Sequence, residues 1–213
     1  MAKTKNSSGK AKAAGDLKKK TALLDKLQPG EAALVLRRLL AGHPELLTEA
    51  EEISRSTLGE VSCESIASEV EDAIRQFDLD DLNGRAGRHS GGYTEPGEAA
   101  YELLGEALEP FVEDMKRHLG LGLEEEAFEI CKGIVLGLYE CRDADDDEFL
   151  GWASDFPAEA AGSAVDDWMG AGKKGASGTQ PGPNRVRLLR EFVDKHVPEW
   201  PWIYEQIAGR KGK

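Results

Sequence analysis

A short glycine-rich stretch holds the residues of this chain that are best suited to chemistry. It reads DLNGRAGRHSGGY over residues 81–93 and combines four glycines with two arginines, a histidine and a serine. A phosphate-binding loop of the GxxxxGK[ST] type needs a lysine and then a hydroxyl residue, but Arg88 and His89 occupy those places. A dinucleotide-binding loop follows a strand, whereas the residues before this stretch have a helical pattern. The stretch therefore does not match either nucleotide-binding loop.

Because neither nucleotide-binding motif fits, residues 81–93 are best described as a cationic loop in an acidic chain. Arg85, Arg88 and His89 are the candidate contacts for a ligand or a partner, and an anion is one ligand they could bind. We expect instead that the arginines form ion pairs with three aspartates just upstream: Asp78, Asp80 and Asp81. Use of Ser90 as a nucleophile with His89 is disfavoured, because adjacent side chains seldom point at each other and no orienting acid is identifiable.

An acidic stretch, CRDADDDEFLGWASD, resembles a calcium loop at its start. Asp143, Asp145 and Asp147 match its positions 1, 3 and 5. The glycine required at position 6 is replaced by Glu148, and the bidentate glutamate at position 12 by Ser154. We therefore expect these carboxylates to lie at the N-terminal turn of a helix, with weak cation binding as the alternative.

The remaining metal-binding and redox residues are scattered. None of the four histidines has a cysteine or a second histidine at metal-ligand spacing: His43, His89, His118 and His196. The three cysteines form no CxxC pair: Cys63, Cys131 and Cys141. We predict no catalytic residue, no cofactor and no metal, and we expect the protein not to be an enzyme. The tryptophans of PEWPWIY (198–204) are predicted to dock on the protein's own core.

Charge is segregated along the 213 residues, whose net charge is −13. Seven lysines lie in residues 1–20 and three basic residues in the last four, so residues 21–209 carry 17 basic and 39 acidic residues. An acidic body repels nucleic acid, so weak binding of nucleic acid would rest on the basic tails. No apolar run reaches the ~18 residues of a membrane span. We expect a reduced, cytoplasmic protein that does not bind membranes.

Helical periodicity extends along most of the chain, and no convincing strand pattern is found. We predict an all-α fold of stacked helical hairpins, either solenoid-like or an irregular bundle. The helix over about 123–142 is apolar nearly all round, which predicts a buried central position. Gly133 and Gly137 lie four residues apart on it and allow another backbone to approach closely. The predicted segments are a disordered basic arm (1–15), a helical domain (16–169), a Gly/Ser/Pro linker (170–184), a C-terminal helix and Trp-rich segment packed on that domain (185–208) and a basic tail (209–213).

Two stretches carry a family resemblance: LLDKLQPGEAALVLRRLLAGHPEL (23–46) and NGRAGRHSGGYTEP with AAYELLGEALEPF (83–96 and 99–111). They resemble the α-helical region of bacterial proteins associated with SWIM-type zinc fingers, over roughly residues 20–150. The zinc motif of that family, CxCx(n)CxH, is absent from this chain. The resemblance implies a helical scaffold for protein–protein interaction and assigns no site residue.

Overall fold

The computed structural model describes residues 23–89, 92–143, 147–170 and 183–209. It divides into two compact units, which we call the N-terminal unit (Met1–Thr57) and the C-terminal unit (Leu58–Lys213). This boundary falls inside the range 16–169, which we had expected to form one helical domain. The predicted arm over 1–15, most of the predicted linker and residues 210–213 lie outside the described residues.

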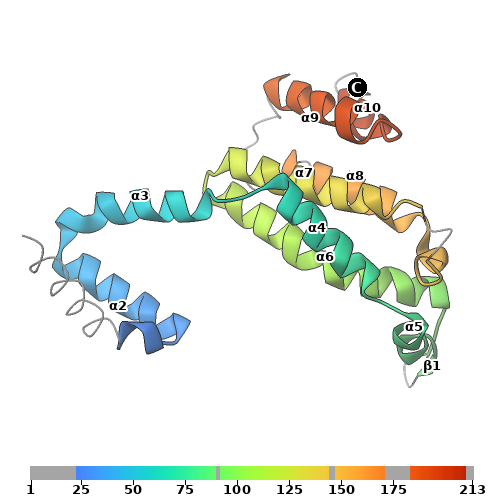
Figure 1. Ribbon diagram of the computed structural model, residues 1–213, viewed down its shortest axis with the longest axis horizontal. Coiled ribbons are helices and arrows are strands. Elements are labelled where there is room, and N and C mark those ends of the chain that lie inside the picture. Colours follow the sequence, from blue (N-terminus) through green and yellow to red (C-terminus); the bar gives the residue numbers. More distant parts are fainter. Residues whose placement is uncertain (1–22, 90–91, 144–146, 171–182, 210–213) are drawn as a thin grey trace, which may run out of the picture. The chain divides into compact units, whose positions relative to one another are not determined.

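The described part of the N-terminal unit contains two α-helices that meet at a short turn. Its elements are η1 (Leu24–Lys26), α2 (Pro29–Gly42), η2 (Pro44–Leu46) and α3 (Leu47–Leu58), the last of which ends one residue beyond the unit. Pro29 occupies the first turn of α2, where its missing N–H is tolerated. The backbone N–H of Gln28 donates to a carboxylate oxygen of Glu31 at 2.9 Å, which completes a capping box. The sequence therefore fixes where α2 begins, and Figure 1 shows α2 and α3 leaving their turn in different directions.

The C-terminal unit contains the remaining elements. They are α4 (Cys63–Arg75), α5 (Leu79–Arg85), β1 (Gly87–His89), β2 (Gly92–Thr94), α6 (Pro96–Gly120), α7 (Glu124–Glu140), η3 (Leu150–Ala153), α8 (Phe156–Trp168), α9 (Pro183–His196) and α10 (Trp202–Gly209). The predicted all-α fold is confirmed, with one small hairpin added. Ser62 caps α4 by accepting a hydrogen bond from the N–H of Ser65 at 3.4 Å.

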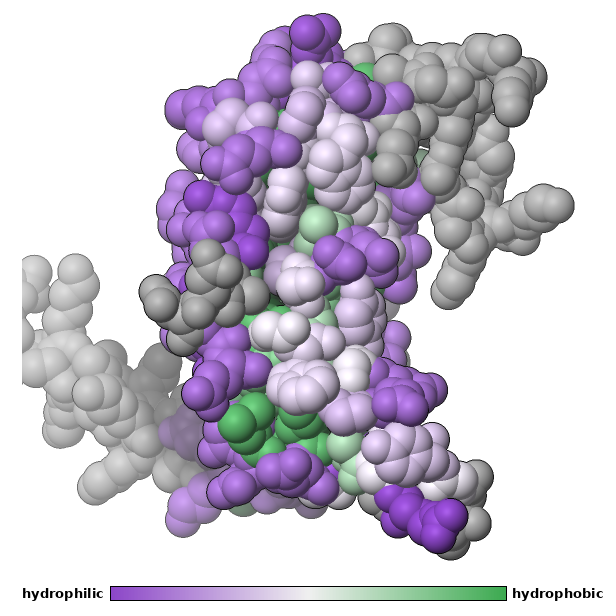
Figure 2. Space-filling view, turned by 90° about the vertical axis from the view of Figure 1, so that its right-hand side faces the viewer, coloured by the Kyte–Doolittle hydropathy of each residue, from purple (hydrophilic) through white to green (hydrophobic). Residues whose placement is uncertain are grey.

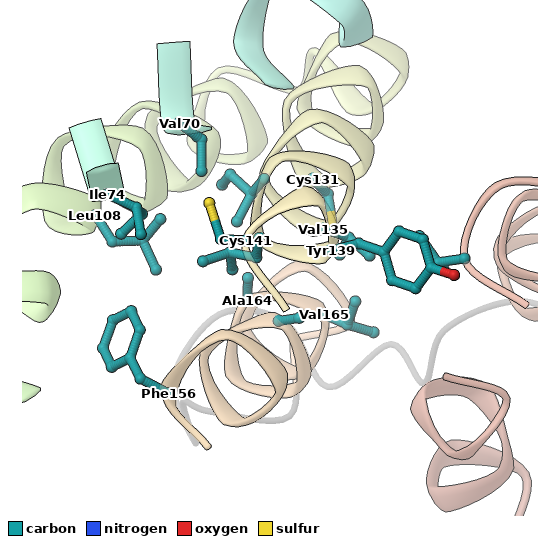
Figure 3. Close-up of a cluster of buried hydrophobic side chains, with 14 of the residues drawn as sticks. Val70, Ile74, Leu108, Cys131, Val135, Tyr139, Cys141, Phe156, Ala164 and Val165 are labelled. Carbon is teal, nitrogen blue, oxygen red and sulfur yellow. The ribbon is translucent and has the colours of Figure 1, made fainter. Parts of the chain in front are cut away.

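Helix α7 is the centre of the C-terminal unit, as its apolar circumference predicts. It packs against α4, α6 and α8, which lie beside it in Figure 1. Its buried residues are Ala127, Ile130, Cys131, Gly133, Ile134, Val135, Gly137, Leu138 and Tyr139. Figure 3 shows side chains from α4, α6 and α8 converging on it, among them Val70, Leu108 and Val165. The helices thus gather around one element as an irregular bundle.

Two glycines allow α4 to approach α7 closely. A Cβ atom on Gly137 would lie 2.5 Å from the carbonyl oxygen of Ala67 and 2.8 Å from Cβ of Val70. On Gly133 it would lie 2.5 Å from Cβ of Ile66. Real Cβ atoms do not come this near to other atoms, so only glycine fits at either position. The predicted close approach of a backbone is confirmed, and its partner is α4.

The C-terminal helices are held on α7 by aromatic and ionic contacts. The rings of Trp200 and Tyr139 meet edge to face, with centroids 5.2 Å apart, and Trp200 is buried. Figure 3 shows Tyr139 pointing from α7 toward these helices. An ion pair joins Arg142 to Glu199, with Nε and Oε2 3.0 Å apart. The predicted docking of the tryptophan segment on its own core is therefore confirmed for Trp200.

Candidate functional site

The glycine-rich stretch forms the end of one helix and most of a hairpin. Asp78 caps α5 by accepting hydrogen bonds from the N–H groups of Asp80 and Asp81, at 2.8 and 3.1 Å. Strands β1 and β2 then pair antiparallel, with Gly87 opposite Thr94. Gly87 has φ of +101°, a conformation that residues with a Cβ rarely adopt. No strand was expected here from the sequence.

Arg85 does form ion pairs, but its partners differ from those we expected. Its guanidinium donates to the carboxylate of Glu106 through Nη1 at 2.8 Å and Nη2 at 2.5 Å, and to Glu102 through Nε at 3.2 Å. The hydrogen bond from Arg85 lowers the pKa of Glu106. The prediction of partners at 78–81 is corrected for Arg85: both glutamates lie on α6, one turn apart, because α5 packs along that helix. Arg85 thus ties α5 to α6, and an anion there would compete with two carboxylates.

Arg88 and His89 lie on the hairpin. Arg88 is exposed and stands directly opposite Tyr93, whose exposed fraction is 61%. Side chains of directly opposed residues lie on the same face of an antiparallel pair. The backbone of His89 pairs with Gly92, while its side chain and Ser90 lie outside the description. Of the two candidate contacts whose side chains are described, Arg88 is therefore the more exposed, and it lies on the same face of the hairpin as Tyr93.

The face of the C-terminal unit seen in Figure 2 is largely hydrophilic, with strongly hydrophobic residues gathered in one area of its lower half. In this unit, the large apolar side chains exposed among the described residues are Leu79, Tyr93, Leu121 and Trp152. They come from α5, β2, the turn after α6, and η3.

Asp147, in the acidic stretch, has a structural role. One carboxylate oxygen of Asp147 accepts hydrogen bonds from the N–H groups of Phe149 and Leu150, both at 3.0 Å, at the start of η3. This agrees with the expected N-terminal turn. Asp143 lies 3.6 Å from the guanidinium of Arg142, and Asp145 is outside the described residues. Across the ranges that the structure covers, no group of three or more histidine, cysteine or acidic side chains is arranged to hold a metal ion.

The three cysteines are free thiols and all are buried. Burial raises the pKa of Cys63 and of Cys141 to about 11, and it raises the pKa of Cys131 as well. A thiol with a raised pKa is a poor nucleophile, because the thiolate is the reactive form. The cysteines therefore serve as packing residues of the core.

The N-terminal unit carries a feature that the sequence analysis missed. None of the residues of α2 or of α3 is buried. Of the twelve large hydrophobic residues that are exposed in the described parts of the chain, eight belong to this unit: Leu23, Leu24, Leu34, Val35, Leu36, Leu39, Leu47 and Ile53. We call the exposed apolar surface formed by these residues the arm face.

The sequence offered a signal for this feature. The apolar residues of α2 cover most of its circumference, a pattern typical of helices buried between neighbours. Helix α3 has a narrower apolar stripe that includes Leu47, Ala50 and Ile53. Among the described residues of the N-terminal unit, α2 and α3 are the only α-helices, so within those residues each helix has at most one helical neighbour. Comparing apolar circumference with the number of available neighbours would have identified the arm face.

Comparisons with known proteins identify no relative of this chain, so its function has to be inferred from the structure. No family model matches the chain, and no curated protein and no solved structure matches it significantly. The resemblance to SWIM-associated helical proteins therefore stays a prediction. Among the described residues, no helix combines the length and the apolar character needed to cross a bilayer.

Proposed function

We propose that this protein is a non-enzymatic helical scaffold that mediates protein–protein interaction. The observation that carries this proposal is the arm face, where eight large apolar side chains are exposed among the described residues of the N-terminal unit. Its residues Leu36 and Leu39 are 49% and 46% exposed, although they lie on the apolar side of α2.

Apolar surface exposed to water is unfavourable. Monomeric proteins seldom expose an extended apolar face, and such faces mark sites where another polypeptide docks. A helix that presents residues at i, i+3 and i+4 is a recurring form of such a site, because its apolar side fits against a groove or a second helix. Ala32, Val35 and Leu36 have this spacing, and Leu39 follows at i+7. The C-terminal unit has a large core of its own.

The structural setting of the other candidate residues supports this choice of function. Arg85 is engaged by two glutamates of α6, which disfavours an anion site as the main role of residues 81–93. We also propose a reduced, cytoplasmic location, supported by three thiols that are buried and free.

Affinity purification of the intact chain from its cells tests the proposal. We expect one stoichiometric protein partner with the wild type, and its loss when Leu36 and Leu39 are both replaced by serine. Leu121→Ser is the matched control, because Leu121 is 51% exposed but lies in the C-terminal unit. Equal recovery of the partner with all three proteins would contradict a role for the arm face. Recovery of no partner, combined with turnover of a substrate, would contradict the scaffold function itself.

A further inference from the structure

Positive charge is concentrated at the N-terminal end of this acidic chain. Residues 1–57 hold 11 lysines and arginines against 7 acidic residues, whereas residues 58–213 hold 16 against 33. Seven of those eleven are lysines within residues 1–20, which we call the lysine-rich segment and in which Asp16 is the only acidic residue. A polyanion is therefore attracted by the lysine-rich segment and repelled by the net charge of the C-terminal unit.

The described lysine and arginine side chains of the N-terminal unit are all exposed, and none of them forms an ion pair with a described residue: Lys26, Arg37, Arg38 and Arg55. In the described parts of the C-terminal unit, by contrast, nine of the eleven lysines and arginines are held in ion pairs. A cation that is already paired has to give up its carboxylate before it can bind another anion. The cations that are available to an anionic ligand are thus concentrated in the N-terminal unit, where three of the four follow the lysine-rich segment closely in the sequence.

Helix α2 separates its cations from its exposed apolar side chains. Its apolar side holds Leu36 and Leu39. Consecutive residues of an α-helix lie about 100° apart around its axis, so Arg37 and Arg38 each lie more than about 90° away from that side. The two arginines therefore lie on the half of α2 that is turned away from its apolar side, and binding of an anion there leaves that side free for a protein.

Nucleic acid is the polyanion that fits this distribution of charge. Its phosphodiester backbone is a linear array of negative charges, and lysine and arginine bind it by releasing condensed counterions. The lysine-rich segment has no aromatic residue, and Met1 and Leu17 are its only large apolar residues. Stacking on bases requires aromatic side chains, and insertion into a bilayer surface requires large apolar ones. The segment is therefore suited to the backbone of nucleic acid rather than to its bases or to a membrane.

We propose that this protein also binds the phosphate backbone of nucleic acid, independently of base sequence, through the lysine-rich segment together with Arg37 and Arg38 of α2. The acidic C-terminal unit opposes this binding, which keeps the affinity low and makes it depend strongly on salt. This function is separate from the proposed scaffold function, because it uses the cations of the N-terminal unit and not the arm face.

The dependence of affinity on salt tests the proposal in the full-length chain. Fluorescence anisotropy measures binding to a short DNA duplex and to a single-stranded RNA, each with two unrelated base sequences. For a duplex, every neutralised phosphate contributes about −0.9 to the slope of log K against log salt. Five to seven contacts therefore predict a loss of affinity of roughly 500- to 6,000-fold between about 50 and 200 mM salt. The two base sequences should bind equally well.

Two sets of substitutions locate the binding residues. Replacing the seven lysines of residues 1–20 with glutamine should abolish binding. Arg37→Gln with Arg38→Gln should reduce the magnitude of the salt slope by about 2, because two phosphate contacts are lost. The matched control is Arg187→Gln with Arg190→Gln, since these arginines are 60% and 65% exposed but are paired with carboxylates of their own helix. The control should bind as the wild type does, and circular dichroism should show the same helical content in every variant.

Three outcomes would overturn the proposal: no binding to either nucleic acid at about 50 mM salt, binding that survives replacement of the seven lysines, or association only with vesicles that contain phosphatidylserine. The last of these would identify a membrane surface as the ligand instead. Leu36→Ser with Leu39→Ser should keep the wild-type affinity for nucleic acid while losing the protein partner. Failure of this proposal and failure of the scaffold function are therefore distinguishable.

Discussion

Replacing Gly137 with alanine adds one methyl group at the closest approach of α4 and α7. The new Cβ would lie 2.5 Å from the carbonyl oxygen of Ala67 and 2.8 Å from Cβ of Val70. Favourable carbon–carbon contacts are about 3.5–4.0 Å, so the two helices would have to separate by roughly 1 Å. The obstructing oxygen belongs to the backbone of α4, so it cannot move aside as a flexible side chain can.

The expected cost follows from two opposing effects. Overpacking of a core costs about 1–3 kcal/mol, and this site belongs at the upper end because the clash involves backbone. Alanine in place of glycine favours a helix by up to about 1 kcal/mol. We therefore expect Gly137→Ala to lower the free energy of unfolding by about 2 kcal/mol. For a protein of this size that corresponds to a fall in Tm of about 4–8 °C.

Gly105→Ala is the matched control, because Gly105 is also helical but a Cβ there would have no atom within 4 Å. It should raise the free energy of unfolding by about 0.5–1 kcal/mol through helix propensity alone. Thermal and urea unfolding followed by circular dichroism measure both variants. If Gly137→Ala is as stable as Gly105→Ala, the close packing of α4 on α7 is wrong.

Three further predictions concern the C-terminal unit. Trp200→Ala should destabilise by about 3 kcal/mol and expose α9 and α10 to protease, because Trp200 is buried against Tyr139, whereas Trp152→Ala should stay within about 0.5 kcal/mol of wild type. Arg85→Ala should lower Tm at neutral pH, and the difference from wild type should shrink as the pH falls through the lowered pKa of Glu106, since protonation of that carboxylate removes its ion pair with Arg85. A difference that stays undiminished in strong acid would contradict this ion pair. At mildly alkaline pH, alkylation of the native thiols should be far slower than alkylation of the unfolded chain. The alkylation rate of Cys63 and Cys141 should rise only as the pH approaches about 11. Mass spectrometry of the labelled chain measures the extent of alkylation at each cysteine.

Local patterns in the sequence were enough to predict the central helix. An apolar circumference placed α7 at the centre, two glycines four residues apart marked the close approach, and terminal aromatic residues indicated docking. Each of these signals lies within one helix or within a few residues. Each depends only on the burial of apolar side chains, which any arrangement of the bundle would require.

Contacts between distant residues were not predictable in the same way. Arg85 was expected to bind aspartates within seven residues, but its partners Glu102 and Glu106 follow it by 17 and 21 residues along the chain. Only the packing of α5 on α6 brings them together. The β-hairpin was missed because strands of three residues are too short for a period of two to show. The arm face was not predicted either, because the exposure of a helix depends on which neighbours it has in the folded protein.

Hydrogen exchange of the wild-type chain, alone and in complex with the protein recovered by affinity purification, tests the central claim most directly, because it reports whether a partner covers the arm face. We expect the amides of α2 and α3 to exchange markedly more slowly in the complex, while those of α7 keep the same protection. Equal exchange of α2 and α3 in both samples would contradict the proposed interaction.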